Sequence, residues 1–204
     1  MSSYSKASAA GVVTVVTIIE DAGLVVWFAL VRSGFTYIGV PIPAIILLAV
    51  LLVEHSIMQR AENPNFTGSV FGKIFGFSLL EVVNWSVWVT LLSNTSSLLS
   101  ISSLIASAYF FVGFYVEHQI TENVITGQPF LHFRNSTGRI TAGVIAETLS
   151  EGVGARLWVF FALGGMGPLA IGFLIVGSAI EHSIQYIVGR IAVTRPVMGS
   201  MTSV

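Results

Sequence analysis

Long apolar stretches with very few charged side chains occupy most of this 204-residue chain. Hydrophobic residues make up 54% of the sequence and charged residues only 9%, and the mean hydropathy is +0.85. A water-soluble domain of this size needs far more polar surface, so this composition excludes a soluble fold. The net charge of −1 gives no reason to expect a nucleic-acid partner. We therefore expect an integral, multi-pass membrane protein whose main partner is the lipid bilayer.

Six of these stretches are long enough to cross a hydrocarbon layer of roughly 30 Å as helices. They are expected at residues 11–32, 40–58, 70–92, 98–121, 140–161 and 168–189. The first stretch follows Lys6, as a signal peptide would, but Glu20 and Asp21 interrupt it and it is too long to be a cleavable segment. The sequence therefore predicts an all-α fold of six transmembrane helices in a single domain, residues 1–204.

The connections between the stretches are of two alternating kinds. The first, third and fifth are short and nearly uncharged, whereas the second and fourth are longer and polar. Most lysines and arginines fall on the side of the longer connections and of both chain ends, and only Arg32 lies near a short connection. Basic residues favour the cytoplasmic side of a membrane, so we expect both termini in the cytoplasm. The predicted plan is three helical hairpins in tandem.

The dipeptide Glu-His recurs near the end of every second stretch. Its three copies, 63 and 64 residues apart, are Glu54-His55, Glu117-His118 and Glu181-His182. This recurrence predicts three internal repeats, at about residues 11–62, 70–124 and 138–190, arranged with pseudo-threefold symmetry.

A further glutamate precedes each Glu-His pair by 34 to 36 residues. These residues are Glu20, Glu81 and Glu147. In the first two repeats a tryptophan follows this glutamate by seven residues, whereas in the third repeat Trp158 follows Glu151 by seven. The sequence therefore leaves open whether Glu147 or Glu151 is the equivalent residue. The tryptophans expected to pack between the hairpins and to close the outer side of the site are Trp27, Trp88 and Trp158.

The two glutamates of each hairpin are equidistant from its tip, which places them at one height in an antiparallel hairpin. We therefore expect the six glutamates, with Glu147 in the third repeat, to form one layer inside the hydrocarbon. A single carboxylate near the membrane centre costs on the order of 3 kcal/mol, and six like charges repel one another. Arg156 is the only basic residue well inside a predicted span. Ionised glutamates in this layer therefore need other cations.

Bound metal ions would stabilise ionised glutamates in such a layer. The alternative is that most of the glutamates are protonated. Carboxylate and neutral imidazole together are the usual ligands of zinc, iron, manganese and copper. The candidate ligands are Glu20, Glu54, His55, Glu81, Glu117, His118, Glu147, Glu151, Glu181 and His182. The chain has no cysteine, which excludes thiolate ligands and iron–sulfur clusters.

Two further acidic residues lie close to this pattern. Asp21 has no counterpart in the other repeats, and we expect it to support the ligands through a hydrogen bond. Glu122 follows His118 by four residues but lies near the cytoplasmic boundary, so we expect it to be solvated.

Three functions are compatible with these residues. The favoured one is a membrane metalloprotein with a buried Glu/His metal centre, either catalytic or electron-transferring. The second is a channel or transporter that moves protons or divalent cations along the acidic layer. The third is a subunit of a larger membrane complex in which the histidines bind a pigment or haem, the weaker cofactor candidate. Repeats in one orientation suit a fixed centre, because many transporters use inverted repeats. A homo-oligomer, and whether the protein is an enzyme, remain open.

Overall fold

The described part of the chain is almost entirely helical. The computed structural model describes residues 3–34, 41–62, 71–93, 100–129 and 138–194. Its six helices are α1 (Ser3–Arg32), α2 (Ile42–Glu62), α3 (Phe71–Ser93), α4 (Ile101–Ile125), α5 (Gly138–Leu163) and α6 (Gly167–Thr194). These residues contain no strand, so the predicted all-α fold is confirmed, with each helix close to a predicted stretch.

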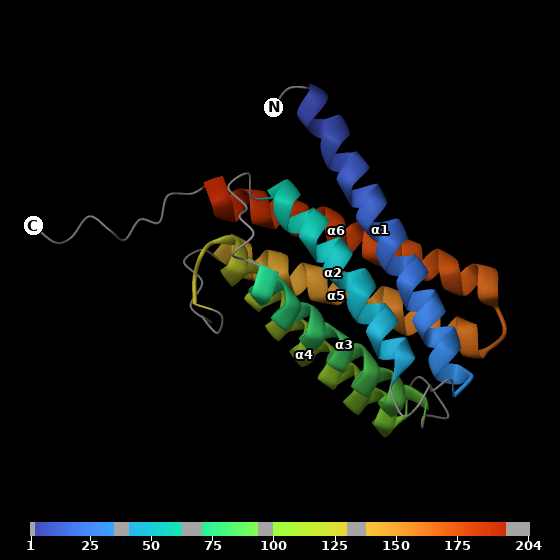
Figure 1. The fold of residues 1–204 in the computed structure, drawn as a ribbon. Coiled ribbons are helices and arrows are strands. Elements are labelled where there is room, and N and C mark those ends of the chain that lie inside the picture. The colour runs from blue at the N-terminus through green and yellow to red at the C-terminus, as the bar shows by residue number, and fades with distance from the viewer. Residues whose placement is uncertain (1–2, 35–40, 63–70, 94–99, 130–137, 195–204) are drawn as a thin grey trace, which may run out of the picture.

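Successive helices run in opposite directions, so the start of α1 and the end of α6 lie toward the same end of the bundle (Figure 1). We call this the terminal end, and the opposite end, where α1 leads into α2, the tip end. The most extensive contacts join α1 to α2, α3 to α4 and α5 to α6. Further contacts join α2 to α3, α4 to α5 and α6 to α1. The six helices therefore form a closed ring.

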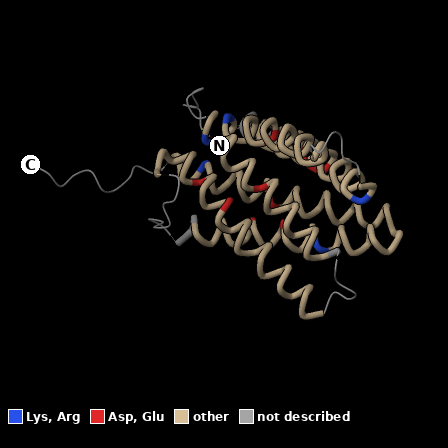
Figure 2. The backbone as a smooth tube through the Cα atoms, turned by 60° about the horizontal axis from the view of Figure 1, so that its bottom comes forward, with Lys and Arg blue, Asp and Glu red and all other residues tan. Residues whose placement is uncertain are grey.

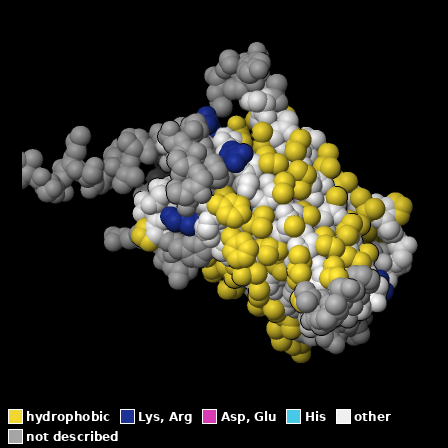
Figure 3. Space-filling model, viewed as in Figure 1, with side chains coloured by type: hydrophobic (Ala, Val, Ile, Leu, Met, Phe, Trp, Pro, Cys, Tyr) yellow, Lys and Arg dark blue, Asp and Glu magenta, His cyan; other side chains and the backbone are white. Residues whose placement is uncertain are grey.

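The outside of the bundle is apolar, and its interior contains acidic and histidine side chains together with a hydrophobic core. Ile18, Val112 and Ile187 are 62%, 61% and 57% exposed, and the face in Figure 3 is largely hydrophobic. The acidic residues lie along the middle of the helices, with the basic residues nearer the ends (Figure 2). Four helices, α1, α2, α3 and α6, are long and apolar enough to cross a membrane. An apolar exterior of this extent is consistent with insertion into a bilayer.

The helices α4 and α5 are of similar length but carry more polar side chains. In α5 these include Glu147, Glu151 and Arg156. Arg156 donates hydrogen bonds to Ser107 Oγ, 2.6 Å away, and to Ser103 Oγ, 2.9 Å away, both in α4. The two helices are thus joined by polar contacts. Their crossing of the membrane stays a prediction.

Small residues bring the two helices of each hairpin close together. The contacts involve Gly23 with Val50, Asn84 with Gly113, and Gly154 with Gly177. At the last of these, a Cβ on either glycine would lie 2.7 Å from the Cα atom of the other. The first member of each contact lies three residues after Glu20, Glu81 or Glu151. This register aligns Glu151, and not Glu147, with the other two glutamates.

An aromatic cluster fills the bundle between the glutamates and the tip end. We define it as Trp27, Trp85, Trp88, Phe110, Phe114 and Trp158, all at most 3% exposed. Trp85 lies at its centre, with ring-centroid distances of 5.3 to 6.2 Å to the other five rings. Trp27 and Trp158 pack between the hairpins as predicted, whereas the ring contacts of Trp88 are with Trp85 and Phe110 of its own hairpin, and Trp85 is an addition.

Candidate metal centre

The ten predicted site residues come from all six helices and are all buried, with at most 6% of any residue exposed. A cavity of about 10 Å³ lies among them, which is the space of about one water-sized sphere. Its lining comprises Glu20, Glu54, His55, Glu81, Glu117, His118, Glu181, His182 and Gln185. The structure therefore brings eight of the predicted residues around one point, together with Gln185, which the sequence analysis did not single out.

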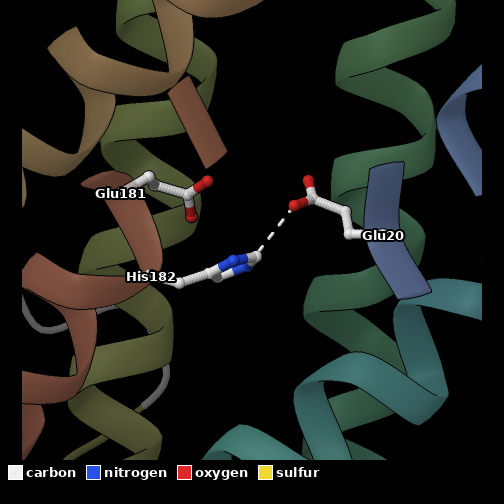
Figure 4. Close-up of side chains that lie close together, drawn as sticks. All are labelled: Glu20, Glu181 and His182. Atoms are coloured by element: carbon white, nitrogen blue, oxygen red, sulfur yellow. Dashed lines mark ion pairs between the residues drawn. The ribbon is translucent and has the colours of Figure 1, made fainter. Parts of the chain in front are cut away.

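Two of the histidines bridge carboxylates of neighbouring helices. His55 Nε2 of α2 lies 3.3 Å from Glu54 and 3.2 Å from Glu81 of α3. His182 Nε2 of α6 lies 3.3 Å from Glu20 of α1 and 3.6 Å from Glu54. Figure 4 shows the His182 ring turned toward Glu20, with Glu181 beside it. These contacts bring together the first and last helices of the chain.

The third histidine has the most carboxylates around it. His118 Nε2 of α4 lies 3.4 Å from Glu117, 3.4 Å from Glu151 of α5 and 3.9 Å from Glu181 of α6. Each histidine thus faces the glutamate beside it or on a neighbouring hairpin, and six carboxylates lie within 3.9 Å of an imidazole Nε2 atom.

The other ring nitrogen of each histidine contacts a hydroxyl group. The Nδ1 atoms of His55, His118 and His182 lie 2.8, 3.2 and 2.9 Å from the hydroxyl oxygens of Ser78, Thr148 and Thr17, respectively. Each hydroxyl residue precedes Glu81, Glu151 or Glu20 by three residues. Sequence reasoning missed these hydroxyls, although their constant spacing to the glutamates was a usable signal. Such contacts fix the orientation of a ligating imidazole.

The hydroxyl group of Thr148 also determines where His118 carries its hydrogen. Thr148 Oγ1 donates its single hydrogen to the carbonyl oxygen of Val144, 2.9 Å away. Toward His118 it can therefore only accept, so Nδ1 is the protonated ring nitrogen. In a neutral imidazole this leaves Nε2 with a lone pair, which faces the oxygens of Glu117, Glu151 and Glu181. Nε2 is therefore the ring atom that can bind a cation or accept a hydrogen from a protonated carboxyl group.

The sequence spacing predicted Glu147 in the layer of glutamates, and the structure has Glu151 at that position. Glu20, Glu81 and Glu151 offer oxygens that all lie within 4.8 Å of one another. Glu147, one helical turn away on α5, instead lies 3.7 Å from the Nδ1 side of His118. Of the two residues between which the sequence could not choose, Glu151 is thus the one grouped with Glu20 and Glu81, and the glycine contact that sets the register of α5 on α6 is the physical reason.

Three groups of side chains in the described residues could hold a metal ion, since their ligand atoms lie within 4.8 Å of one another. The groups are Glu20 with Glu181 and His182, His55 with Glu81 and Glu117, and Glu20 with Glu81 and Glu151. Glu20 and Glu81 belong to two groups each. The donors are carboxylate and imidazole, a set that fits iron, manganese or zinc.

Three neighbouring residues complete the surroundings of these groups. Ser178 of α6 donates a hydrogen bond to Asp21 Oδ1, 2.9 Å away, and the expected support of the ligands by Asp21 stays a prediction. Trp85 Nε1 donates to Glu81 Oε1 at 3.2 Å. The expectation for Glu122 was wrong, since it is only 3% exposed. The reason is that α4 continues to Ile125 and its last turns remain inside the bundle.

Comparisons with known proteins do not identify a relative of this chain. No protein-family model matches the chain, and neither the curated proteins nor the solved structures gave a match. The function has to be argued from the chemistry of the centre itself.

Proposed function

We propose that the chain is a multi-pass membrane metalloprotein in which the layer of glutamates and histidines binds one or more metal ions. The carrying observation is the Nε2 atom of His118, whose lone pair faces three carboxylates at 3.4 to 3.9 Å. A metal ion is the partner that satisfies such a lone pair and the carboxylate oxygens together. The hydroxyl group behind each imidazole has the role that such groups have in metal sites, which is to fix the ring.

The proposal includes six membrane spans in three tandem hairpins, with both termini in the cytoplasm. The ring supports this number, because α4 and α5 lie between α3 and α6, which are apolar enough to span. Their lengths of 25 and 26 residues match those neighbours. The recurrence of the glycine contact and of the hydroxyl–histidine contact in each hairpin supports an internal repeat with pseudo-threefold symmetry.

The role of the ion is catalytic or electron-transferring. Iron, manganese, copper or zinc bound here would supply redox chemistry or Lewis acidity to a small substrate. The side chains of the chain would hold the ion and its charge away from lipid, and the aromatic cluster would exclude water from the tip side.

Two observations argue against the other functions. The aromatic cluster closes the bundle axis on the tip side, which opposes conduction of protons or cations through the protein. The cavity of about 10 Å³ has no room for a porphyrin, which opposes haem.

Metal analysis of protein purified without chelators tests the proposal. We expect stoichiometric metal by mass spectrometry, and a large loss of that metal in Glu151→Gln, because this residue faces both His118 Nε2 and the other glutamates. Glu147→Gln is the matched control on the same helix, one turn away, and should retain the metal.

Protein without stoichiometric metal, whose melting temperature does not respond to added zinc, iron, manganese or copper, would exclude this function. Most of the glutamates would then be protonated and hydrogen-bonded to one another and to the imidazoles.

A further inference from the structure

The interior of the bundle carries more buried polar residues on the terminal side of the centre than on the tip side. Several buried polar residues lie between the centre and the terminal end, among them Gln59, Glu62, Glu122, Glu147 and Gln185. Gln59, Glu62, Glu122 and Gln185 follow the histidines of their helices by three to seven residues. On α5, which runs in the opposite direction, Glu147 precedes Glu151 by four residues. At roughly 1.5 Å per residue, they extend up to about 10 Å from the imidazoles.

The described residues leave polar atoms of these side chains without a hydrogen-bond partner. Neither carboxylate oxygen of Glu62 or of Glu122 has a hydrogen-bond partner among the described residues, and neither do Gln59 Nε2 and Gln185 Oε1. All four residues are at least nine-tenths buried. Buried polar groups of native proteins are normally paired with protein, water or ions. These groups are therefore built to contact water or cations inside the bundle.

Two details connect these groups into a route. Gln185 lines the cavity at the centre together with the glutamates and histidines, so its unpartnered oxygen borders the candidate ligands. At the far end, Glu62 is the last residue of α2, and its carboxylate lies against Gly189 of α6, where a Cβ would approach it to 2.9 Å. A side chain at that position would occupy the space beside Glu62.

On the tip side the equivalent positions are apolar. Leu51 precedes His55 by four residues, as Gln59 follows it by four, and it is fully buried. Phe114 and Glu122 stand in the same relation to His118. Beyond these residues the aromatic cluster fills the axis. Fewer polar groups are buried on this side, among them Asp21, Asn84 and Ser178, and the rings of the aromatic cluster would not compensate a charge for its lost hydration.

We propose that Gln59, Glu62, Glu122, Glu147 and Gln185 form a one-sided access path along which cations reach the centre from the terminal end. Acidic groups raise the local concentration of cations in such a path, and the two amides offer uncharged oxygens next to the centre. Only the identity of the cation as a metal ion rests on the proposed function; the path itself does not.

Thiol modification tests the path, because the chain has no cysteine and each variant carries a single thiol. The variants are Gln59→Cys and, as the matched control on the same helix, Leu51→Cys. Both positions are equally buried, so a difference in rate reports polar access. We expect the cationic reagent aminoethyl methanethiosulfonate to modify Gln59→Cys about tenfold faster than Leu51→Cys, since a thiol in apolar surroundings is inert. Equal rates, or faster modification of Leu51→Cys, would overturn the proposal.

A second pair guards against variants that do not fold. If one of the α2 variants reacts as fast as protein that has been unfolded in detergent and urea, the modification rates of Glu122→Cys and Phe114→Cys on α4 are compared instead. A faster rate for Glu122→Cys then supports the path.

Metal uptake separates this proposal from the proposed function. Protein stripped by a chelator and reloaded with Mn²⁺ should take up the ion about tenfold more slowly in Glu122→Gln, with unchanged final stoichiometry, because a charge that attracts cations is lost. An unchanged uptake rate would contradict the path. If the native protein binds no metal, the proposed function fails, and the thiol rates still decide whether the path exists.

Discussion

At the scale of single residues, the orientation of three imidazole rings determines what the centre can do. Each ring contacts a hydroxyl group through Nδ1 and faces carboxylates through Nε2. For His118 the hydroxyl group of Thr148 also sets the tautomer, because its own hydrogen is donated to the backbone of α5. The chemistry of the centre therefore depends on residues that are not themselves candidate ligands.

Removal of one hydroxyl group should weaken the centre without removing a ligand. Thr148→Val keeps the side-chain shape but leaves His118 Nδ1 without its acceptor. We expect metal affinity to fall about 10- to 100-fold, the usual effect of losing such a contact, as measured by competition with a chelator. Ser150→Ala, which removes a hydroxyl bonded only to the carbonyl oxygen of Glu147, is the control. Equal affinities of the two variants would show that the hydroxyl of Thr148 does not position the ring.

The sequence predicted the candidate metal ligands better than it predicted the polar residues that surround them. The Glu-His repeat and the preceding glutamates led directly to the residues around the cavity. Glu62, Gln59 and Gln185 were missed because single polar residues near a helix end look the same whether they face water or the bundle interior. Only the extension of α2 to Glu62 and of α6 past Gln185 shows that these positions are enclosed.

At the scale of helices, register decides which residues reach the centre. Apolar length alone gave the positions of all six helices to within a few residues, apart from the earlier start of α1. It could not distinguish Glu147 from Glu151, because they lie one turn apart on the same face of α5. The contact between Gly154 and Gly177 resolves this, and such a contact depends on two helices that only the folded structure brings together.

A methyl group at this contact should destabilise the α5–α6 hairpin. In Gly177→Ala the new Cβ would lie 2.7 Å from the Cα of Gly154, so the backbones must move apart. We expect a loss of about 1–3 kcal/mol in the free energy of unfolding, as for other overpacked sites, measured by unfolding in detergent. Gly172→Ala on the same helix, where nothing lies within 4 Å, should leave the stability unchanged or raise it. A Gly177→Ala protein as stable as Gly172→Ala would contradict the role of the contact.

At the scale of the whole molecule, the ring of helices differs from a soluble protein in where it places its polar residues. Apolar side chains cover the exterior, and the acids and histidines are buried in the interior beside a hydrophobic core. This distribution follows from composition and could be predicted. The closure of the ring by α6 on α1 could not, because it depends on contacts between the two ends of the sequence.

The topology has a direct test in the cysteine-free chain. A thiol introduced by Ser33→Cys, at the tip end, should react with a membrane-impermeant maleimide on intact cells. A thiol introduced by Gln128→Cys, after α4 at the terminal end, should react only after the membrane is opened. The reverse pattern would place the termini outside the cytoplasm, against the distribution of basic residues.

Closure of the ring also dictates an order of events during biosynthesis. Thr17 and His182 are in contact although 165 residues separate them. While the ribosome is still making α6, Glu20 has already left it without its imidazole neighbour, His182. The first hairpins must therefore wait as an incomplete assembly, and a nascent chain released before residue 182 lacks one imidazole of the centre.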